Sequence, residues 1–252
     1  MTLSRRDMLR YATLGSGVAL ISALGAQGTA QAGPVLGTIV DYSAAVPSAS
    51  AIRRAGHIGA IRYVSDPRPD AAWMKAKPLT AWEADALTDS GLEVVSCYQY
   101  GKGATADWRG GLEAGVRHAR RGLELHRAAG GPANRPIYAS IDDNPTFEQF
   151  TTLIAPYLVG WQQVVGAANL GVYANSPTID WASAAGLGAF FWQHDWGTPK
   201  GYVHPRANLH QIPGEVRIDG IGVDINHVLT PDYGQWSLAD SVPDTSPGIL
   251  GS

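Results

Sequence analysis

The amino-acid sequence predicts an α/β fold, a (β/α)8 barrel of the TIM type. Eight short apolar runs alternate with segments of helical pattern, which is the order of elements in a barrel of parallel strands. Several apolar runs begin just after Gly or Pro, as is typical where a helix ends and a strand starts. A doubly wound open sheet is the alternative, but the sequence has no glycine-rich phosphate-binding motif to favour it.

The expected strands are residues 37–43, 60–65, 93–100, 136–144, 170–175, 189–196, 208–212 and 222–228. Helices are expected at 48–55, 80–90, 107–129, 146–168 and 177–185. The third of these carries an apolar stripe at helical spacing, formed by Leu112, Val116, Ala119 and Leu123. The connections 197–207 and 213–221 are too short or too irregular for full helices, so the later part of the barrel is expected to be irregular.

The first 32 residues predict an export signal. Arg5 and Arg6 precede a modestly apolar stretch, and Ala30-Gln31-Ala32 provides the small residues of a cleavage site. This pattern predicts export by the twin-arginine machinery, with cleavage after Ala32 and a mature protein in the periplasm, cell wall or medium. The apolar stretch is shorter than the ~20 residues of a spanning helix, so no stable membrane anchor is expected. The barrel is then expected at 33–236, followed by a loose tail at 237–252.

Charge and cysteine content exclude several function classes. The signal holds Arg5, Arg6, Arg10 and Asp7, so its removal reduces the 19 basic and 22 acidic side chains to 16 and 21. With this acidic balance and no dense basic run, nucleic acid is not an expected partner. Cys97 is the single cysteine, so no internal disulfide can form, and its apolar surroundings predict a buried core residue.

The fourth expected strand ends in polar residues. Because side chains alternate along a strand, Asp142 and Asn144 are expected to face the barrel mouth, where barrels place their active sites. Asp143 points the other way, and we expect it to serve the turn or cap the next helix.

Two more strands carry an aspartate with the same orientation, Asp41 in the first and Asp224 in the eighth. The first and eighth strands are neighbours in a closed barrel, which places Asp41 beside Asp224 with Asp142 across the mouth. Each aspartate alone is better explained as a cap of the following helix or turn. Three aspartates with the same orientation favour a shared catalytic site, because carboxylates that repel one another in one barrel mouth destabilise the fold and are expected there only if they serve a function.

Other strand ends add aromatic, amide and further polar groups to the expected rim. Aromatic rings stack on sugar faces while amide and carboxylate groups bind hydroxyls, so this composition indicates a sugar-binding site. For Phe190, Phe191 and Trp192 we expect the barrel core instead. The candidate substrate-binding residues are Tyr98, Tyr100, Asn144, Tyr173, Asn175, Gln193, His194, Asp195, Trp196, Gln211 and Asn226.

The histidines do not predict a metal centre. His194, His210 and His227 lack the spacing of a known metal site, and no cofactor-binding motif is present, so we expect neither metal nor cofactor. A metal-dependent hydrolase that uses the three aspartates remains an alternative, with an ion bound among them.

Five runs carry a resemblance to a known family: Asp41-Tyr42-Ser43 and residues 60–66, 96–103, 141–145 and 191–194. Over its whole length, the chain resembles twin-arginine-exported mycobacterial proteins with a glycoside-hydrolase-like domain. The resemblance implies a barrel related to the family 25 muramidases, which cleave peptidoglycan glycan strands. In those enzymes an aspartate ends the first strand, Asp-x-Glu ends the fourth and Asp-x-Asn lies in the eighth, a pattern that Asp41, Asp142 and Asp224-Ile225-Asn226 match.

Asn144 departs from the family pattern, because it stands where the muramidases have the glutamate taken to be their general acid. An asparagine amide is no proton donor at neutral pH, so a hydrolase would need another acid, and Asp142 is the first candidate. Asp41 or Asp224 would then stay ionised. The expected function is hydrolysis of peptidoglycan or a related cell-wall glycan. The alternative is a catalytically inert glycan-binding or regulatory module of the cell envelope.

Overall fold

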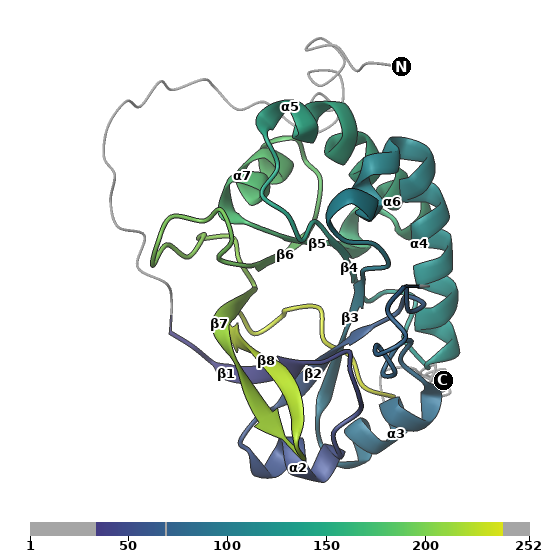
Figure 1. Cartoon of the computed structure of the whole chain (residues 1–252), viewed down its shortest axis with the longest axis vertical. Coiled ribbons are helices and arrows are strands. Elements are labelled where there is room, and N and C mark those ends of the chain that lie inside the picture. Colours follow the sequence, from purple (N-terminus) through teal and green to yellow (C-terminus); the bar gives the residue numbers. More distant parts are fainter. Residues whose placement is uncertain (1–33, 69, 239–252) are drawn as a thin grey trace, which may run out of the picture.

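The computed structural model describes residues 34–68 and 70–238, which form a closed eight-stranded barrel with helices around it (Figure 1). The strands follow one another around the barrel in chain order, and β8 closes it against β1. The predicted α/β barrel is therefore confirmed. The expected signal at 1–32 and most of the expected tail at 237–252 lie outside the described residues.

All eight expected strands are present, most of them shorter than expected. They are β1 (Gly37–Asp41), β2 (Gly59–Tyr63), β3 (Glu93–Tyr98), β4 (Ile137–Ser140), β5 (Leu170–Ala174), β6 (Phe190–Gln193), β7 (Leu209–Ile218) and β8 (Ile221–Val228).

Helices form in all five places where they were expected. They are α2 (Ala49–Arg54), α3 (Ala81–Asp89), α4 (Gly111–Ala128), α5 (Phe147–Gln149), α6 (Ala155–Val165) and α7 (Ser176–Ala184). Shorter pieces are the 3₁₀ turns η2 (Gly103–Thr105), η3 (Asp107–Gly110) and η5 (Ala167–Asn169) and the π-helical η4 (Phe150–Ile154) between α5 and α6. Side-chain caps fix several helix starts, as Ser48 does for α2 and Thr80 for α3.

The eighth strand corrects the expectation of a fully parallel barrel. β8 runs antiparallel to both β7 and β1, because β7 and β8 form a hairpin instead of a strand-helix-strand unit. Its turn has Asp219 and Gly220 at positive φ (53° and 74°), the conformation that an Asp-Gly turn adopts. Asp219 also accepts hydrogen bonds from the backbone and hydroxyl of Ser48, which ties the hairpin to α2.

The barrel interior is filled by alternate side chains of the strands. Phe190 and Trp192 belong to this interior, as expected, whereas Phe191 packs outside it against the helices. Cys97 is also buried inside the barrel as a free thiol, as predicted. The fully or nearly fully buried interior residues are Ile39, Ile61, Tyr63, Val95, Cys97, Tyr138, Tyr173, Trp192, Leu209, Val228 and Tyr233.

Candidate active site

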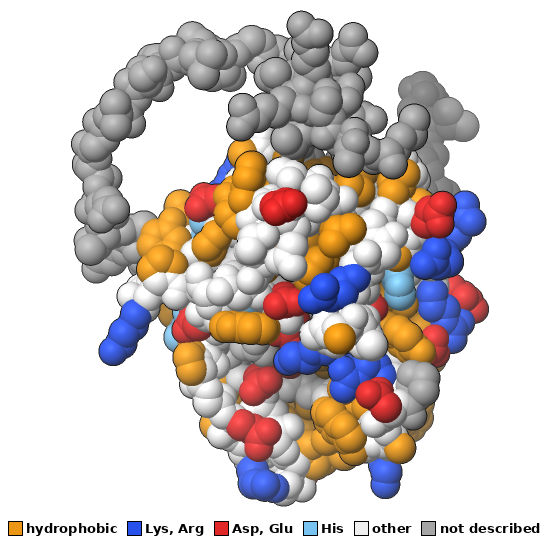
Figure 2. Space-filling model, turned by 45° about the horizontal axis from the view of Figure 1, so that its top comes forward, with side chains coloured by type: hydrophobic (Ala, Val, Ile, Leu, Met, Phe, Trp, Pro, Cys, Tyr) orange, Lys and Arg blue, Asp and Glu red, His pale blue; other side chains and the backbone are white. Residues whose placement is uncertain are grey.

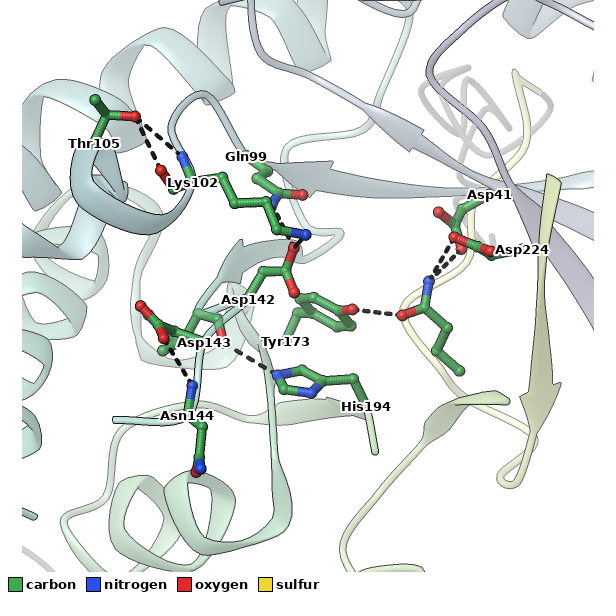
Figure 3. Close-up of polar contacts among 12 residues, drawn as sticks. Asp41, Gln99, Lys102, Thr105, Asp142, Asp143, Asn144, Tyr173, His194 and Asp224 are labelled. Atoms are coloured by element: carbon green, nitrogen blue, oxygen red, sulfur yellow. Dashed lines mark hydrogen bonds and ion pairs between the residues drawn. The ribbon is translucent and has the colours of Figure 1, made fainter. Parts of the chain in front are cut away.

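A pocket of about 320 Å³ opens at the end of the barrel where β1 and β4 finish. Asp41 is the last residue of β1, and Asp142 follows β4 by two residues. Asp224 lies opposite Asp41 in the β1–β8 register, in the first half of β8, because β8 runs antiparallel. All three carboxylates line the pocket. Figure 3 shows Asp41 beside Asp224, with Asp142 apart from them.

Asp41 is almost completely buried, with 3% of its surface exposed, and is held by neutral donors. Its Oδ2 accepts from Asn226 Nδ2 (2.8 Å) and Gln211 Nε2 (3.0 Å), and its Oδ1 accepts from the Tyr63 hydroxyl (3.3 Å). Burial, and next the charge of Asp224, raise the pKa of Asp41 to about 7 despite these hydrogen bonds. Asp41 therefore holds a proton close to neutral pH.

Gln211 connects the two neighbouring carboxylates. Its Nε2 lies within hydrogen-bonding distance of Asp41 Oδ2 and of Asp224 Oδ2 (3.3 Å), and its Oε1 accepts from the Tyr173 hydroxyl (2.5 Å). Burial raises the pKa of Asp224, and the charges of Glu215 and Asp142 add to this effect. The pair thus shares one amide donor and has no cation within salt-bridge distance among the described residues.

Asp142 has a different environment. Its Oδ2 forms a salt bridge with Lys102 Nζ at 2.6 Å and accepts from Gln99 Nε2 at 3.0 Å. Its side chain is 18% exposed, and that of Lys102 is 55% exposed. An adjacent ammonium and an amide donor both stabilise a negatively charged carboxylate. The pocket therefore combines a carboxylate that is paired with a cation and one that is buried among neutral donors, with its pKa raised to about 7.

A second pocket of about 250 Å³ adjoins the first and shares Asp142, Tyr173, Gln211 and Asp224 with it. His194, Asp195 and Trp196 line only this second pocket. Together the two pockets form a groove across the barrel mouth.

In the second pocket, His194 and Asp195 are held by hydrogen bonds, whereas Trp196 is open to solvent. His194 Nε2 donates to the Ile141 carbonyl (3.3 Å), its Nδ1 is buried without a hydrogen-bond partner, and burial lowers the pKa of its imidazole. Asp195 accepts from His210 Nε2 at 2.7 Å. Trp196 is 56% exposed, so its ring is available for stacking.

Asn144 and Asn175, expected at the mouth, lie outside both pockets. The Asn144 amide oxygen accepts from Asn175 Nδ2 (2.9 Å), and Figure 3 shows its side chain directed away from Asp142. Asn175 is fully buried and caps α7 by accepting from the backbone of Thr178. The reason is that β4 and β5 end before these residues, so the strand alternation does not extend to them.

The two tyrosines at the end of β3 also lie elsewhere. Cys97 points into the barrel, so Tyr98 points outward, where its hydroxyl bonds His118 (2.7 Å) and its ring packs on Trp161. Tyr100 packs against the same outer cluster. Gln193 is buried and anchors the β6–β7 connection, because it donates to the Tyr202 carbonyl and accepts from the backbone of His204. None of these three side chains lines either pocket.

Asp143 lies in the turn after β4, as expected, where its Oδ1 accepts from the backbone of Asn144. It does not cap the following helix. Thr146 is the N-cap of α5 and forms a capping box with Gln149.

Several pocket residues were not anticipated from strand ends, because they come from connections. Lys77 lies in the connection between β2 and α3, and Gln99 and Lys102 follow β3. Arg68 and Trp73 come from the same β2–α3 connection as Lys77. Gln99 and Lys102 lie within the run 96–103, which carried part of the family resemblance and was the available signal for them, whereas no such run contains Trp73 or Lys77. Figure 2 shows acidic and basic side chains close together around a hollow on this face.

Two properties of residues 34–68 and 70–238 bear on the alternatives. No helix there is both long and apolar enough to cross a membrane. No group of three or more His, Cys, Asp or Glu side chains there is arranged to hold a metal ion. The metal-dependent alternative therefore gains no support from the way the three aspartates are placed.

A barrel whose mouth holds two carboxylates in different environments, one buried and one paired with a cation, is an architecture of glycoside hydrolases. The chain belongs to the Rv2525c-like family with a glycoside hydrolase-like domain, whose family model matches residues 50–228.

The chain is 57% identical over 243 residues to "Putative peptidoglycan hydrolase Rv2525c" of Mycobacterium tuberculosis (strain ATCC 25618 / H37Rv), with 94% of this chain and all of that protein covered. A crystal structure of the M. tuberculosis Tat-secreted protein Rv2525c in complex with L-tartrate matches with a TM-score of 0.79 and 60% identity, over 80% of this chain and 100% of that chain. The bacterial lysozyme from Streptomyces coelicolor matches at a TM-score of 0.50 and 15% identity, over 77% of this chain and 92% of that chain, and shows the shared fold alone.

Proposed function

We propose that the chain is an exported protein that binds and hydrolyses peptidoglycan or a related cell-wall glycan. The name of the M. tuberculosis relative supports the substrate class, and the description of that relative as Tat-secreted supports export. The Arg5-Arg6 motif and the Ala30-Gln31-Ala32 site agree with export by the twin-arginine machinery.

This proposal rests on one observation: Asp41 and Asp142 lie in the same pocket but in different environments. Glycoside hydrolysis requires a proton donor for the leaving oxygen and a second carboxylate that acts on the opposite side of the sugar. The pKa of Asp41, raised to about 7 by burial, suits a general acid near neutral pH. Asp142, paired with Lys102, suits the ionised partner.

We therefore assign the acid to Asp41 and not to Asp142, which was the first candidate from the sequence. Two amide donors occupy Oδ2 of Asp41, so the proton resides on Oδ1, beside the Tyr63 hydroxyl. In the proposed step this proton passes to the glycosidic oxygen as its bond to the sugar breaks, and Asp142 stabilises the developing positive charge or activates the attacking water. Asp224 contributes a negative charge that keeps the proton on Asp41.

Aromatic side chains along the groove provide surfaces for sugar rings. Tyr63, Trp73 and Tyr173 line the first pocket, and Trp196 lines the second. Trp73 and Trp196 are each more than half exposed, so their faces are available to a glycan that lies along the groove.

The test is release of reducing ends from purified peptidoglycan, with and without prior removal of its stem peptides by an amidase. We expect Asp41→Asn to reduce the rate by about 10²- to 10⁴-fold, because it removes the general acid. The wild-type rate should fall as pH rises through about 7, where Asp41 loses its proton. Asp85→Asn, which removes an exposed carboxylate on α3, is the matched control and should leave the rate unchanged. A rate that is insensitive to Asp41→Asn would overturn the assignment of the acid.

A second candidate function is glycan binding without cleavage. The resemblance to the family 25 muramidases implies a glutamate where this chain has Asn144, whose side chain accepts from Asn175 outside both pockets, and Asp41 is almost inaccessible to solvent. This function predicts saturable binding of peptidoglycan fragments with no reducing ends released by the wild-type chain. The same assay therefore separates the two functions.

A further inference from the structure

Lys77 is a buried cation in the first pocket. It is 8% exposed, its Nζ donates to the Gln99 carbonyl at 2.8 Å, and it lies 4.0 Å from the centroid of the Tyr63 ring. Among the described residues no carboxylate lies within 4.0 Å of Nζ. By contrast, Lys102 is paired with Asp142. Burial of an ammonium without a counter-ion is costly, and here it lowers the pKa of Lys77 to about 8.

The backbone around Lys77 is firmly held. Arg62, fully buried, donates to the Ala76 carbonyl at 2.6 Å and to the Tyr42 carbonyl at 2.7 Å, and it is itself fixed by a salt bridge with Glu83 at 2.5 Å. On the other side of Lys77, the Leu79 backbone donates to the Tyr63 carbonyl at 2.8 Å. The ammonium is therefore positioned in advance by the fold, which reduces the ordering cost of binding a ligand.

The surroundings of Lys77 define the chemistry of its ligand. An ammonium has three N–H donors, and the Gln99 carbonyl takes one of them, so an anionic oxygen in the pocket can accept a charge-assisted hydrogen bond. Because Asp142 and Asp224 line the same pocket, a singly charged carboxylate is tolerated better than a phosphate with two charges. The Trp73 ring lines this pocket and is 53% exposed, and such a ring favours a sugar as the carrier of that carboxylate.

The second pocket is not lined by a cationic side chain. Its lining residues include Asp142, Asp195 and Asp224 but no Lys or Arg. A groove with Arg68, Lys77 and Lys102 at one end and no Lys or Arg at the other can discriminate between sugars by charge. These charges favour an acidic sugar in the first pocket and a neutral sugar in the second.

We propose that Lys77 binds the carboxylate of an acidic sugar, so that the ligands of the groove are glycans with a free carboxylate. This inference rests on the proposed glycan-binding function and narrows it. The carboxylate is that of the lactyl ether of muramic acid or of a uronic acid, which share this chemistry. In peptidoglycan the lactyl carboxylate is free only where the stem peptide has been removed, so an amide-hydrolysing reaction must precede binding.

The test compares ligands that differ in one charge. The full chain is titrated with the disaccharide of N-acetylglucosamine and N-acetylmuramic acid, and with the same disaccharide after conversion of its lactyl carboxyl group to an amide. We expect the acid to bind about 10- to 100-fold more tightly, the effect of one charge-assisted hydrogen bond. A disaccharide with glucuronic acid in place of N-acetylmuramic acid identifies which source of carboxylate is preferred.

The variant Lys77→Gln should bring the two affinities to within about threefold of each other. The Gln99 carbonyl keeps its hydrogen bond from the Ser65 hydroxyl (2.7 Å), so this variant leaves no unpaired buried carbonyl. Lys75→Gln removes the same charge from an exposed position two residues away and should preserve the preference.

Equal binding of the acid and the amide by the wild-type chain overturns the role of Lys77 but leaves glycan binding intact, and this comparison requires no variant to fold. If the Lys77→Gln variant still binds the acid more tightly than the amide, the role of Lys77 is also overturned. Failure of every disaccharide to bind overturns both this inference and the proposed function.

Discussion

The two sides of the pocket contain the same residue type in contrasting surroundings. Asp41 is buried, bonded to Asn226, Gln211 and Tyr63, and next to the like charge of Asp224. Asp142 is partly exposed and paired with a cation. Burial without a counter-ion favours the protonated acid, whereas a salt bridge favours the carboxylate. This difference shows that the surrounding residues, and not the residue type, determine the chemical role of each aspartate at the barrel mouth.

The largest expected effect on stability comes from Asp41→Asn. The folded state holds the Asp41 proton up to a pKa of about 7, whereas the unfolded chain releases it near 3.8. The folded state thus binds more protons between these values, and the free energy of unfolding falls as pH rises from about 4 to 7. We expect Asp41→Asn to raise the free energy of unfolding by roughly 2 to 4 kcal/mol at pH 8 and by little at pH 4, as measured by denaturant unfolding.

Asp85→Asn provides the reference for this measurement, since it removes an exposed carboxylate and should change the free energy of unfolding by less than about 0.5 kcal/mol at either pH. A destabilised Asp41→Asn protein at pH 8 would show that the site favours the charged carboxylate, contrary to the comparison above.

The second prediction concerns Asn226, which supports Asp41 from inside the barrel. Asn226 is fully buried, donates to Asp41 and accepts from Trp192 Nε1 at 2.8 Å. Asn226→Ala leaves the buried indole N–H without a partner, so we expect a loss of about 2 to 3 kcal/mol in thermal or denaturant unfolding. The pKa of Asp41 should also rise, because this hydrogen bond lowers it. Asn134→Ala, at an exposed position, should be neutral, and equal losses in both variants would contradict the supporting role.

The sequence was sufficient for the parts of the molecule that depend on local pattern. Apolar runs and helical spacing predicted eight strands and the positions of the helices, and alternation along β1 placed Asp41 at the mouth. Asp224 was also expected beside Asp41, although the direction assumed for β8 was wrong. Alternation is unchanged when a strand is reversed, and neighbours in a barrel remain neighbours. Asp224 also lies near the middle of β8, so the reversal did not carry it to the other end of the barrel.

Alternation failed where the strands had already ended. Asn144 and Asn175 follow β4 and β5, and local hydrogen bonds and helix capping fix them instead. Lys77 could not be placed from the sequence, because a long connection with backbone bonds to distant strands positions it. The raised pKa of Asp41 could not be predicted from the sequence either, because it depends on burial and on Asp224, which is far away in the sequence.

The third prediction separates the influence of Asp224 from that of burial. Burial is the largest cause of the raised pKa of Asp41, and the charge of Asp224 is the second. Asp224→Asn removes only the second cause, so the pKa of Asp41 should fall below about 7 and remain above 3.8. The measurement is NMR titration of the Asp41 carboxyl carbon, and the activity of the variant should decline at lower pH than that of the wild type. Glu148→Gln, at an exposed position on α5, is the control. An unchanged midpoint would mean that burial alone protonates Asp41.

The smallest expected effect on stability comes from the opposite side of the pocket. Lys102 is more than half exposed, and solvent screens its salt bridge with Asp142, so Lys102→Met should lower the free energy of unfolding by less than about 1 kcal/mol. Lys75→Met, an exposed lysine with no salt bridge among the described residues, is the matched control in the same urea titration. A loss above about 2 kcal/mol would mean that Asp142 is as dependent on its neighbour as Asp41 is on Asn226. A small loss would instead show that the salt bridge of Asp142 contributes little to stability, in contrast to the buried hydrogen bonds of Asn226 beside Asp41.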